Sequence, residues 1–264
     1  MWPFSLGGAF IKYPVALISD IHANLDAFQV VLEDISARGI KRVVCLGDTV
    51  GYGPNPRECL DLVMEHCEWM LMGNHDYAAM YEPTNFNIGA EAASYWTREQ
   101  LEQETDREKR NRRWHFLGDL PFRQNFDFGL LAVHGSPRRP INEYIFADDI
   151  NNSPVKMQQI FDRVERCCMV GHTHVQGVFT EEPDFYSPAE IGGVYEFRAG
   201  EKTVINVGSV GQPRDRDPRS GYAILHKEKV EFVRLEYNID AVASKVQAIP
   251  ALNDFFGQRL YEGR

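Results

Sequence analysis

The chain has 264 residues, of which 44% are hydrophobic and 25% are charged, and its formal net charge is −10. This length can bury a sizeable core. The acidic balance excludes a general nucleic-acid-binding surface, because a polyanion would be repelled at long range. No run of about 18 apolar residues occurs, so a membrane span is not expected.

The N-terminus and the cysteines bear on the compartment. Residues 1–13 lack a basic leader and a sustained apolar segment, so we interpret them as a tail rather than a signal peptide. Apolar Trp2-Pro3-Phe4 in this tail could contribute to a homo-oligomer. The five cysteines show no C-x-x-C spacing, which argues against a disulfide framework or a zinc ribbon. A reducing, cytoplasmic setting fits them best.

Strands and helices alternate at the start of the chain. Apolar runs predict strands over 15–19, 43–46 and 69–72. Apolar residues at spacings of three and four predict a helix over 25–38, and a second helix over 56–66 begins at a proline. This order implies a parallel sheet with right-handed crossovers.

Residues 88–117 are helical in pattern and very polar, with charges of both signs, which indicates a solvated helical surface. We place them in a cap inserted over about 83–125. From about residue 175, short runs with Gly and Pro turns predict a strand-rich second half. We expect one domain over 1–264 with two sheets. Its later elements are strands over 130–133, 167–170, 193–198, 203–206, 222–226 and 230–235, and helices over 155–166 and 239–248.

Polar residues follow the predicted strands, beginning with Asp20 and His22 after the first. In extended chain two residues this far apart project to the same side. Ligands bind beyond the carboxyl ends of the strands in open α/β sheets, so we expect these side chains to converge there. The set comprises Asp20, His22, Asp48, Asn74, His75, His134, His172 and His174.

Each of these residues has an ordinary structural alternative when it is considered alone. Asp20 could cap a helix, Asp48 could be a turn residue, and His75 or His134 could be a buried structural imidazole. Together, a mixed set of nitrogen and oxygen donors exceeds what one tetrahedral zinc binds. Two ions fit, and the donors suit Mn, Fe or Zn better than Mg or Ca. Such a pair would make the site locally positive, so we expect an anionic substrate.

The motifs "SDIHAN", "LGDTVGYGP", "MGNHD", "VHGSP" and "VGHTH" occur in order between residues 19 and 174. This chain therefore resembles the calcineurin-like metallophosphoesterases, and residues 205–225 resemble the tail of their small bacterial members. The resemblance implies an α/β fold, a four-layer α/β/β/α sandwich of two mixed β-sheets flanked by helices. It also implies phosphoester hydrolysis by a hydroxide that bridges two metal ions.

The resemblance assigns a role to each motif residue. It implies that Asp20, His22 and His174 hold one ion, and that Asn74, His134 and His172 hold the other. Asp48 would bridge the two ions, and His75 would be the general acid.

The substrate prediction rests on a departure from the family pattern. Members that act on phosphoproteins carry an Asp-Arg pair soon after the second motif, whereas this chain has "GYGPNP" at 51–56. We therefore favour a small phosphodiester or nucleotide-type substrate. Arg214 and Arg138 could contact its phosphate, although surface ion pairs are an equal alternative. The other functions left open are a phosphomonoesterase, including a phosphoprotein phosphatase, and a non-catalytic metal-binding scaffold.

Overall fold

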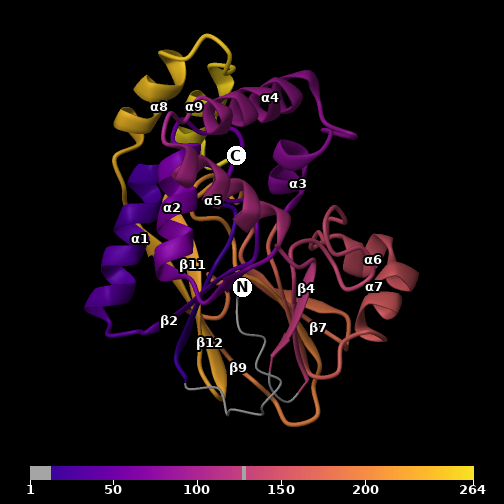
Figure 1. Ribbon diagram of the computed structural model, residues 1–264. Coiled ribbons are helices and arrows are strands. Elements are labelled where there is room, and N and C mark those ends of the chain that lie inside the picture. Colours follow the sequence, from indigo (N-terminus) through magenta and orange to yellow (C-terminus); the bar gives the residue numbers. More distant parts are fainter. Residues whose placement is uncertain (1–12, 127–128) are drawn as a thin grey trace.

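Two six-stranded β-sheets face each other at the centre of the molecule (Figure 1). The computed structural model describes residues 13–126 and 129–264. In spatial order, the first sheet consists of β3 (Trp69–Met70), β2 (Arg42–Cys45), β1 (Val15–Ile18), β11 (Ser220–Leu225), β12 (Lys229–Leu235) and β9 (Val194–Glu196). The second consists of β4 (Arg123–Phe126), β5 (Leu130–Val133), β6 (Cys167–Val170), β10 (Thr203–Asn206), β7 (Gly177–Thr180) and β8 (Asp184–Tyr186).

Both sheets are mixed. Strands β1, β2 and β3 are parallel to one another, as are β5, β6 and β10, and the remaining pairs are antiparallel. The carboxyl ends of the parallel strands therefore lie together at one end of each sheet, which is where ligands bind in such sheets.

Helices cover the outer face of each sheet. Figure 1 shows α1 (Leu25–Ala37) and α2 (Pro56–His66) on one side, and α6 (Asp149–Asn152) and α7 (Pro154–Phe161) on the other. The remaining helices lie above or beside the first pair in this view: α3 (Asn74–Met80), α4 (Ile88–Glu102), α5 (Arg107–Gly118), α8 (Ile239–Gln247), α9 (Phe255–Gln258) and the 3-10 helix Arg259–Glu262.

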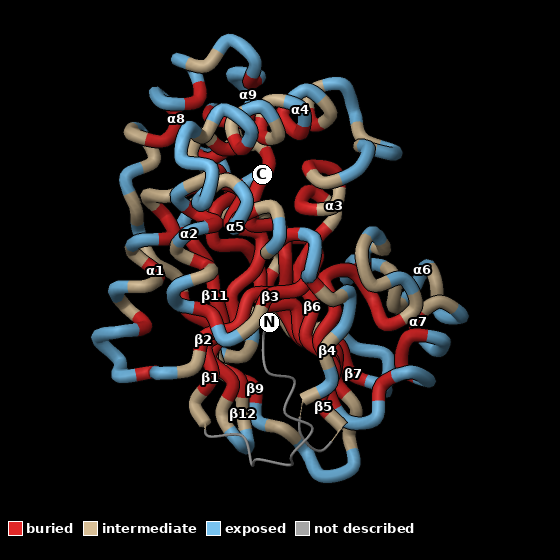
Figure 2. Tube along the Cα trace, in the orientation of Figure 1, coloured by how far each residue is buried: buried red, intermediate tan, exposed pale blue. Residues whose placement is uncertain are grey.

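The alternation of side chains along the strands produces the layers. In β1, Val15 and Leu17 pack in the core between the two sheets, whereas Ala16 and Ile18 pack against the helices outside. Strand β5 divides its side chains between the inner core and α7 in the same way. Figure 2 shows these strands buried and the outer helix surfaces exposed. The predicted four-layer α/β/β/α sandwich is confirmed.

Several element boundaries differ from the sequence predictions. The helical stretch predicted over 88–117 is two helices, because Asp106 accepts hydrogen bonds from the amides of Glu108 and Lys109 and starts α5. Helix α7 ends at Phe161 rather than Arg166, where tighter hydrogen bonds between residues three apart replace the helical pattern. Strands β4, β7 and β8 were not predicted; β4 and β8 are short sheet edges with several polar residues.

No helix within residues 13–126 and 129–264 is both long and apolar enough to cross a bilayer.

Candidate metal centre

The eight side chains that were expected to converge do lie close together, beyond the ends of the parallel strands. All except Asn74 are buried. The donor atoms of the seven histidines and aspartates form three overlapping groups, and within each group every donor atom lies within 4.8 Å of the others. The groups are Asp20, His22 and His174; His22, Asp48 and His75; and Asp48, His134 and His172.

The backbone that presents them is not extended, so the expectation for Asp20 and His22 was wrong in its geometry. Asp20 has φ +53° and His22 has φ +48°, in the left-handed region. Their amides donate to the carbonyls of Gly47 at 2.9 Å and Asp48 at 3.0 Å, which fixes this turn against the next strand end. His22 Nε2 still lies 3.8 Å from Asp20 Oδ1.

Left-handed backbone recurs through the site. Asp48, His172 and His174 have φ values of +55°, +67° and +62°. Each costs a side-chain-bearing residue about 1–2 kcal/mol, and such strain clusters at functional sites. The motif residues therefore supply the donor atoms and also form the tight turns that direct these atoms inward.

Backbone carbonyls orient three imidazoles. The Nδ1 atoms of His22, His134 and His174 lie 3.2, 3.0 and 2.6 Å from the carbonyl oxygens of Val50, Leu46 and Gln212. Each contact requires a proton on Nδ1, which leaves the Nε2 lone pair free to bind a cation.

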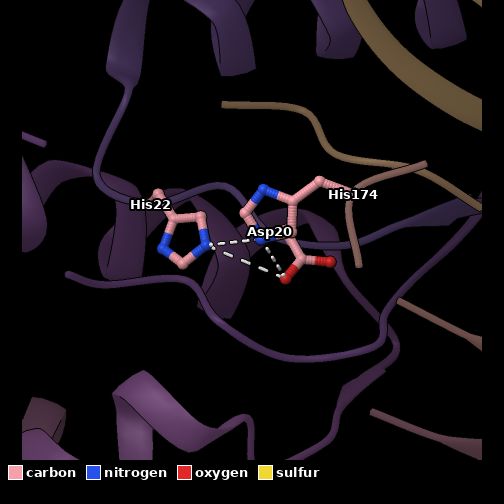
Figure 3. Close-up of side chains that lie close together, drawn as sticks. All are labelled: Asp20, His22 and His174. Atoms are coloured by element: carbon pink, nitrogen blue, oxygen red, sulfur yellow. Dashed lines mark hydrogen bonds and ion pairs between the residues drawn. The ribbon is translucent and has the colours of Figure 1, made fainter. Parts of the chain in front are cut away.

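In the first group, three donor atoms surround one point (Figure 3). His174 Nε2 lies 3.1 Å from both His22 Nε2 and Asp20 Oδ1. Ligand atoms about 2.0–2.2 Å from one metal ion lie about 3.0–3.5 Å from each other. Two unprotonated Nε2 atoms facing each other beside a carboxylate therefore fit a shared metal ion.

The group of Asp48, His134 and His172, with Asn74 beside it, has the same character. His134 Nε2 lies 3.3 Å from Asp48 Oδ2 and 3.2 Å from Asn74 Oδ1. His172 Nε2 is buried without a hydrogen-bond partner. Asp48 Oδ2 also lies 3.8 Å from His22 Nε2, so this carboxylate stands between the two groups. The residues present fit two ions that share Asp48.

The pKa values of these groups follow from burial and charge. Burial, with repulsion from His134, lowers the pKa of His172 to about 3, so this imidazole is neutral near pH 7. Burial also disfavours charge on His134, but Asp48 and Asp20 outweigh it and raise its pKa to about 9. Without a metal ion, the carboxylates therefore attract a proton to the place where a cation fits.

His75 occupies an aromatic enclosure beside both groups. Its ring lies 4.3 Å from Tyr52, 4.7 Å from Phe86 and 4.9 Å from His22, between ring centroids. Its amide donates to Asp48 Oδ1 at 2.8 Å, and its Nδ1 is buried without a partner. Burial lowers its pKa to about 4.

A cleft of about 730 Å³ opens over the site. One wall comes from residues 82–90 and the other from residues 139–144. Tyr144 stacks on the His172 ring at 3.9 Å with an interplanar angle of 20°. The aromatic residues that line the cleft are Tyr52, Tyr77, Phe86, Phe122 and Tyr144.

The arginines are placed differently from one another. Arg138 donates to Glu143 at 2.8 Å and to Gln159 at 2.6 Å, and it does not line the cleft. The adjacent Arg139, which the sequence analysis did not select, is exposed and lines the cleft. Arg214 places its Cζ 5.9 Å from the Tyr52 ring centroid, and its amide donates to the His174 carbonyl at 3.2 Å.

Asp76 was also missed, although it is the last residue of the quoted "MGNHD" motif. Its buried carboxylate accepts the amides of Asp48 at 2.7 Å, Thr49 at 3.0 Å, Val50 at 3.3 Å and Gly73 at 3.1 Å. It therefore holds the loop that presents Asp48.

Comparison with known proteins finds relatives that are similar in sequence and in fold. The calcineurin-like phosphoesterase superfamily domain matches residues 14–229. An uncharacterized protein of Methanocaldococcus jannaschii is 36% identical over 262 residues, which cover 96% of this chain and 100% of the relative. The crystal structure of a metallophosphoesterase from Sphaerobacter thermophilus is 36% identical with a TM-score of 0.80, covering 96% of this chain and 100% of that one.

A hypothetical protein from Pyrococcus horikoshii OT3 has the same fold, with 20% identity, a TM-score of 0.71, and coverage of 95% of this chain and 98% of that one. The superfamily match and the two relatives at 36% identity extend over most of the described chain. This chain belongs to the calcineurin-like phosphoesterase superfamily.

Proposed function

We propose that the chain hydrolyses a small phosphodiester or nucleotide-type substrate with the help of two divalent or transition-metal ions. One observation carries this proposal: the buried donors of Asp20, His22 and His174 and those of His134 and His172 meet at Asp48 beside a cleft. Imidazoles whose Nδ1 atoms face backbone carbonyls turn Nε2 towards the buried carboxylates, an arrangement that suits a bound cation.

Asp20, His22 and His174 would hold one ion, and Asn74, His134 and His172 the other, with Asp48 shared. The nitrogen-rich set suits Mn, Fe or Zn. When bound, such ions supply a hydroxide nucleophile near neutral pH and offset charge on the phosphoryl oxygens.

His75 is our candidate for the general acid. Its ring is held between Tyr52 and Phe86 at the cleft, next to the donor groups. A substrate phosphate beside the ring would favour the protonated imidazole, which can then give its proton to the leaving alkoxide.

The cleft supports a substrate whose leaving group carries an aromatic ring, such as a nucleoside with its base. Phe122 is exposed in its wall and offers a flat apolar surface for stacking, and Tyr144 adds an exposed ring edge beside His172. We propose that Arg139, which lines the cleft, and Arg214, which lies beside Tyr52, contact the phosphate, whereas Arg138 already binds Glu143. We propose that the cap over about 83–125 belongs to the same single domain and shapes this pocket.

The proposal also covers the compartment in which the protein acts and the molecules that it binds. All five cysteines are free and buried, which supports a reducing, cytoplasmic setting. The acidic net charge supports a small-molecule substrate over nucleic acid. The proposed contribution of Trp2-Pro3-Phe4 to a homo-oligomer falls outside the described residues.

The test compares hydrolysis of bis(p-nitrophenyl) phosphate and p-nitrophenyl phosphate by chelator-treated protein with Mn²⁺ restored. We expect metal-dependent cleavage of the diester, lowered about 10²–10⁴-fold in His75→Ala. The exposed His115→Ala is the matched control and should retain activity. Cleavage of the monoester alone would favour a phosphomonoesterase. Binding of two ions without turnover of either ester would favour the scaffold.

A further inference from the structure

The imidazole of His172 is oriented differently from those of the other histidines that are expected to bind the ions. Backbone carbonyls hold the Nδ1 atoms of His22, His134 and His174. Among residues 13–126 and 129–264, no carbonyl takes this role for His172, and its Nε2 is buried without a partner. Its amide donates to Asp20 Oδ2 at 3.0 Å, but this bond fixes only the backbone and not the ring.

An aromatic ring takes the place of the missing carbonyl. Tyr144 stacks on His172 with 3.9 Å between the ring centroids and 20° between the ring planes. Phe146 adds a nearly parallel ring, whose centroid lies 5.3 Å from that of Tyr144 at an interplanar angle of 7°. His172 is 4% exposed and Tyr144 is 40% exposed, so the tyrosine ring shields one face of the imidazole from the cleft. The stack restricts rotation of the imidazole, because a rotated ring would lose this contact.

The backbone at Tyr144 is anchored by contacts that do not involve the metal centre. The next residue, Ile145, is buried and packs in the core cluster that includes α7. Lys156 on α7 donates from Nζ to the carbonyl of Tyr144 at 2.7 Å. The amide of Phe146 donates to the carboxylate of Asp149 on α6 at 2.8 Å. The tyrosine ring is therefore presented by a segment that is attached to the outer helices on both sides.

The same segment connects two of the donors that surround one point. Residues 135–146 begin directly after His134 and lead back to the stack on His172. Bonds within the segment close it on itself: the amide of Gly135 donates to the carbonyl of Pro140 at 2.6 Å, and the hydroxyl of Ser136 donates to Glu143. One wall of the cleft thus starts at one donor and supports another.

We propose that Tyr144 is a positioning residue for His172, and that its ring holds the imidazole in the orientation that binds an ion together with Asp48 and His134. The ring acts by stacking, so the hydroxyl is not required. Because the imidazole is already ordered, the ion does not have to supply the free energy of ordering it. This inference rests on the two-ion centre of the proposed function and extends it, since the affinity for one ion then depends on a wall of the substrate cleft.

The test titrates Mn²⁺ into chelator-treated protein by isothermal titration calorimetry. Tyr144→Phe keeps the ring and removes the hydroxyl, whereas Tyr144→Leu keeps an apolar side chain and removes the ring. Tyr95→Leu is the matched control, because Tyr95 on α4 is exposed to a similar extent, 43%, and its hydroxyl bonds to Glu82. The three variants are compared with the wild-type protein.

We expect the wild-type protein to bind two ions, and Tyr144→Leu to weaken one of the two binding steps about 3–10-fold while the other is unchanged. The unchanged step reports that the variant is folded. Tyr144→Phe and Tyr95→Leu should bind both ions as the wild-type protein does. Two unchanged steps in Tyr144→Leu, an equal weakening of both steps, or a loss in Tyr144→Phe as large as that in Tyr144→Leu would overturn positioning by the ring.

This readout separates the two proposals, because calorimetry needs no turnover. A protein that hydrolyses neither ester but shows the weakened step in Tyr144→Leu would overturn the proposed hydrolysis and leave this inference standing. An active enzyme whose Tyr144→Leu variant binds both ions normally would do the reverse. A wild-type protein that binds fewer than two ions would overturn both.

Discussion

The carboxylate of Asp76 accepts the backbone amide of Asp48 at 2.7 Å, so one buried aspartate holds the other in place. The same carboxylate receives the amides of Thr49, Val50 and Gly73, and both of its oxygens are used twice. The carboxylate that stands between the two donor groups is thus positioned by a second acid that lies on α3. A carboxylate is required here because all four partners are donors.

Replacing this acid by an amide should loosen the centre. In Asp76→Asn the new NH₂ group would face backbone N–H donors, leaving two of them unpaired at about 1–3 kcal/mol each. We expect Mn²⁺ affinity to fall about 10–100-fold, as is usual when a group supporting a metal ligand is lost. Calorimetric titration of chelator-treated protein measures it.

The exposed Asp119→Asn is the control for the loss of one negative charge. Unchanged Mn²⁺ affinity in Asp76→Asn would show that the loop keeps its shape without this carboxylate.

Gly51 is predicted to be essential for the position of His75. It has φ +91°, and a Cβ at this position would overlap Nδ1 of His75 and lie 2.9 Å from its Cγ. Gly51→Ala should therefore displace the imidazole, and a displacement of about 1 Å costs on the order of 10²-fold in rate. Diesterase activity should fall while the number of bound Mn²⁺ ions stays the same.

Gly39→Ala separates this clash from backbone strain. Gly39 has φ +70° but no atom within 4 Å of the position of a Cβ. Gly39→Ala should therefore lose about 1–2 kcal/mol of stability from backbone strain alone, Gly51→Ala should lose at least as much, and only Gly51→Ala should lose activity. Equal activities would show that His75 does not depend on Gly51.

The donor residues could be predicted from sequence because parallel strands deliver their carboxyl ends to a common edge. Asp20, Asp48 and His172 each follow an apolar run, and once the runs are placed in parallel sheets their convergence follows. The layers were predictable for a similar reason, because continuous apolar runs of this length mark strands that are buried on both faces.

The remaining features depend on local geometry that residue types do not encode. Arg138 and Arg139 are adjacent and chemically identical, and only the turn of the chain directs one to Glu143 and the other to the cleft. Arg214 lies 5.9 Å from the ring centroid of Tyr52, although the two residues are far apart in the sequence. Such neighbours are set by tertiary packing, so no sequence period reveals them.

Metal binding should raise the thermal stability. Ions that bind only the folded protein stabilise it by about 2.7 kcal/mol at a concentration 100 times Kd. For a chain of this size that corresponds to an increase in Tm of about 5–10 °C. Differential scanning calorimetry with and without Mn²⁺ measures it. His134→Ala should lose most of the increase, and the partly exposed His66→Ala should keep it. An identical Tm with and without Mn²⁺ would contradict a metal centre built from these residues.

Three hydrogen bonds of Arg113 hold α5 to α2 and to the segment just after the end of α4. Arg113 on α5 makes two hydrogen bonds to the carboxylate of Asp61 on α2, at 2.9 and 2.7 Å, and one to Glu104 at 2.9 Å. Its side chain is 5% exposed, although Asp61 is 47% exposed, so solvent screens part of the attraction. Arg113→Met keeps the apolar stem and removes these bonds, and we expect a loss of about 1–3 kcal/mol in the free energy of unfolding.

The neighbouring Arg112→Met is the matched control, because Arg112 is exposed on the same helix. Urea unfolding should show the loss in Arg113→Met alone. Since α5 contacts both α3, which carries His75, and α4, the same variant should also raise KM for the diester more than it lowers kcat. A loss of stability with unchanged KM would mean that the ion pairs hold α5 to α2 without shaping the cleft.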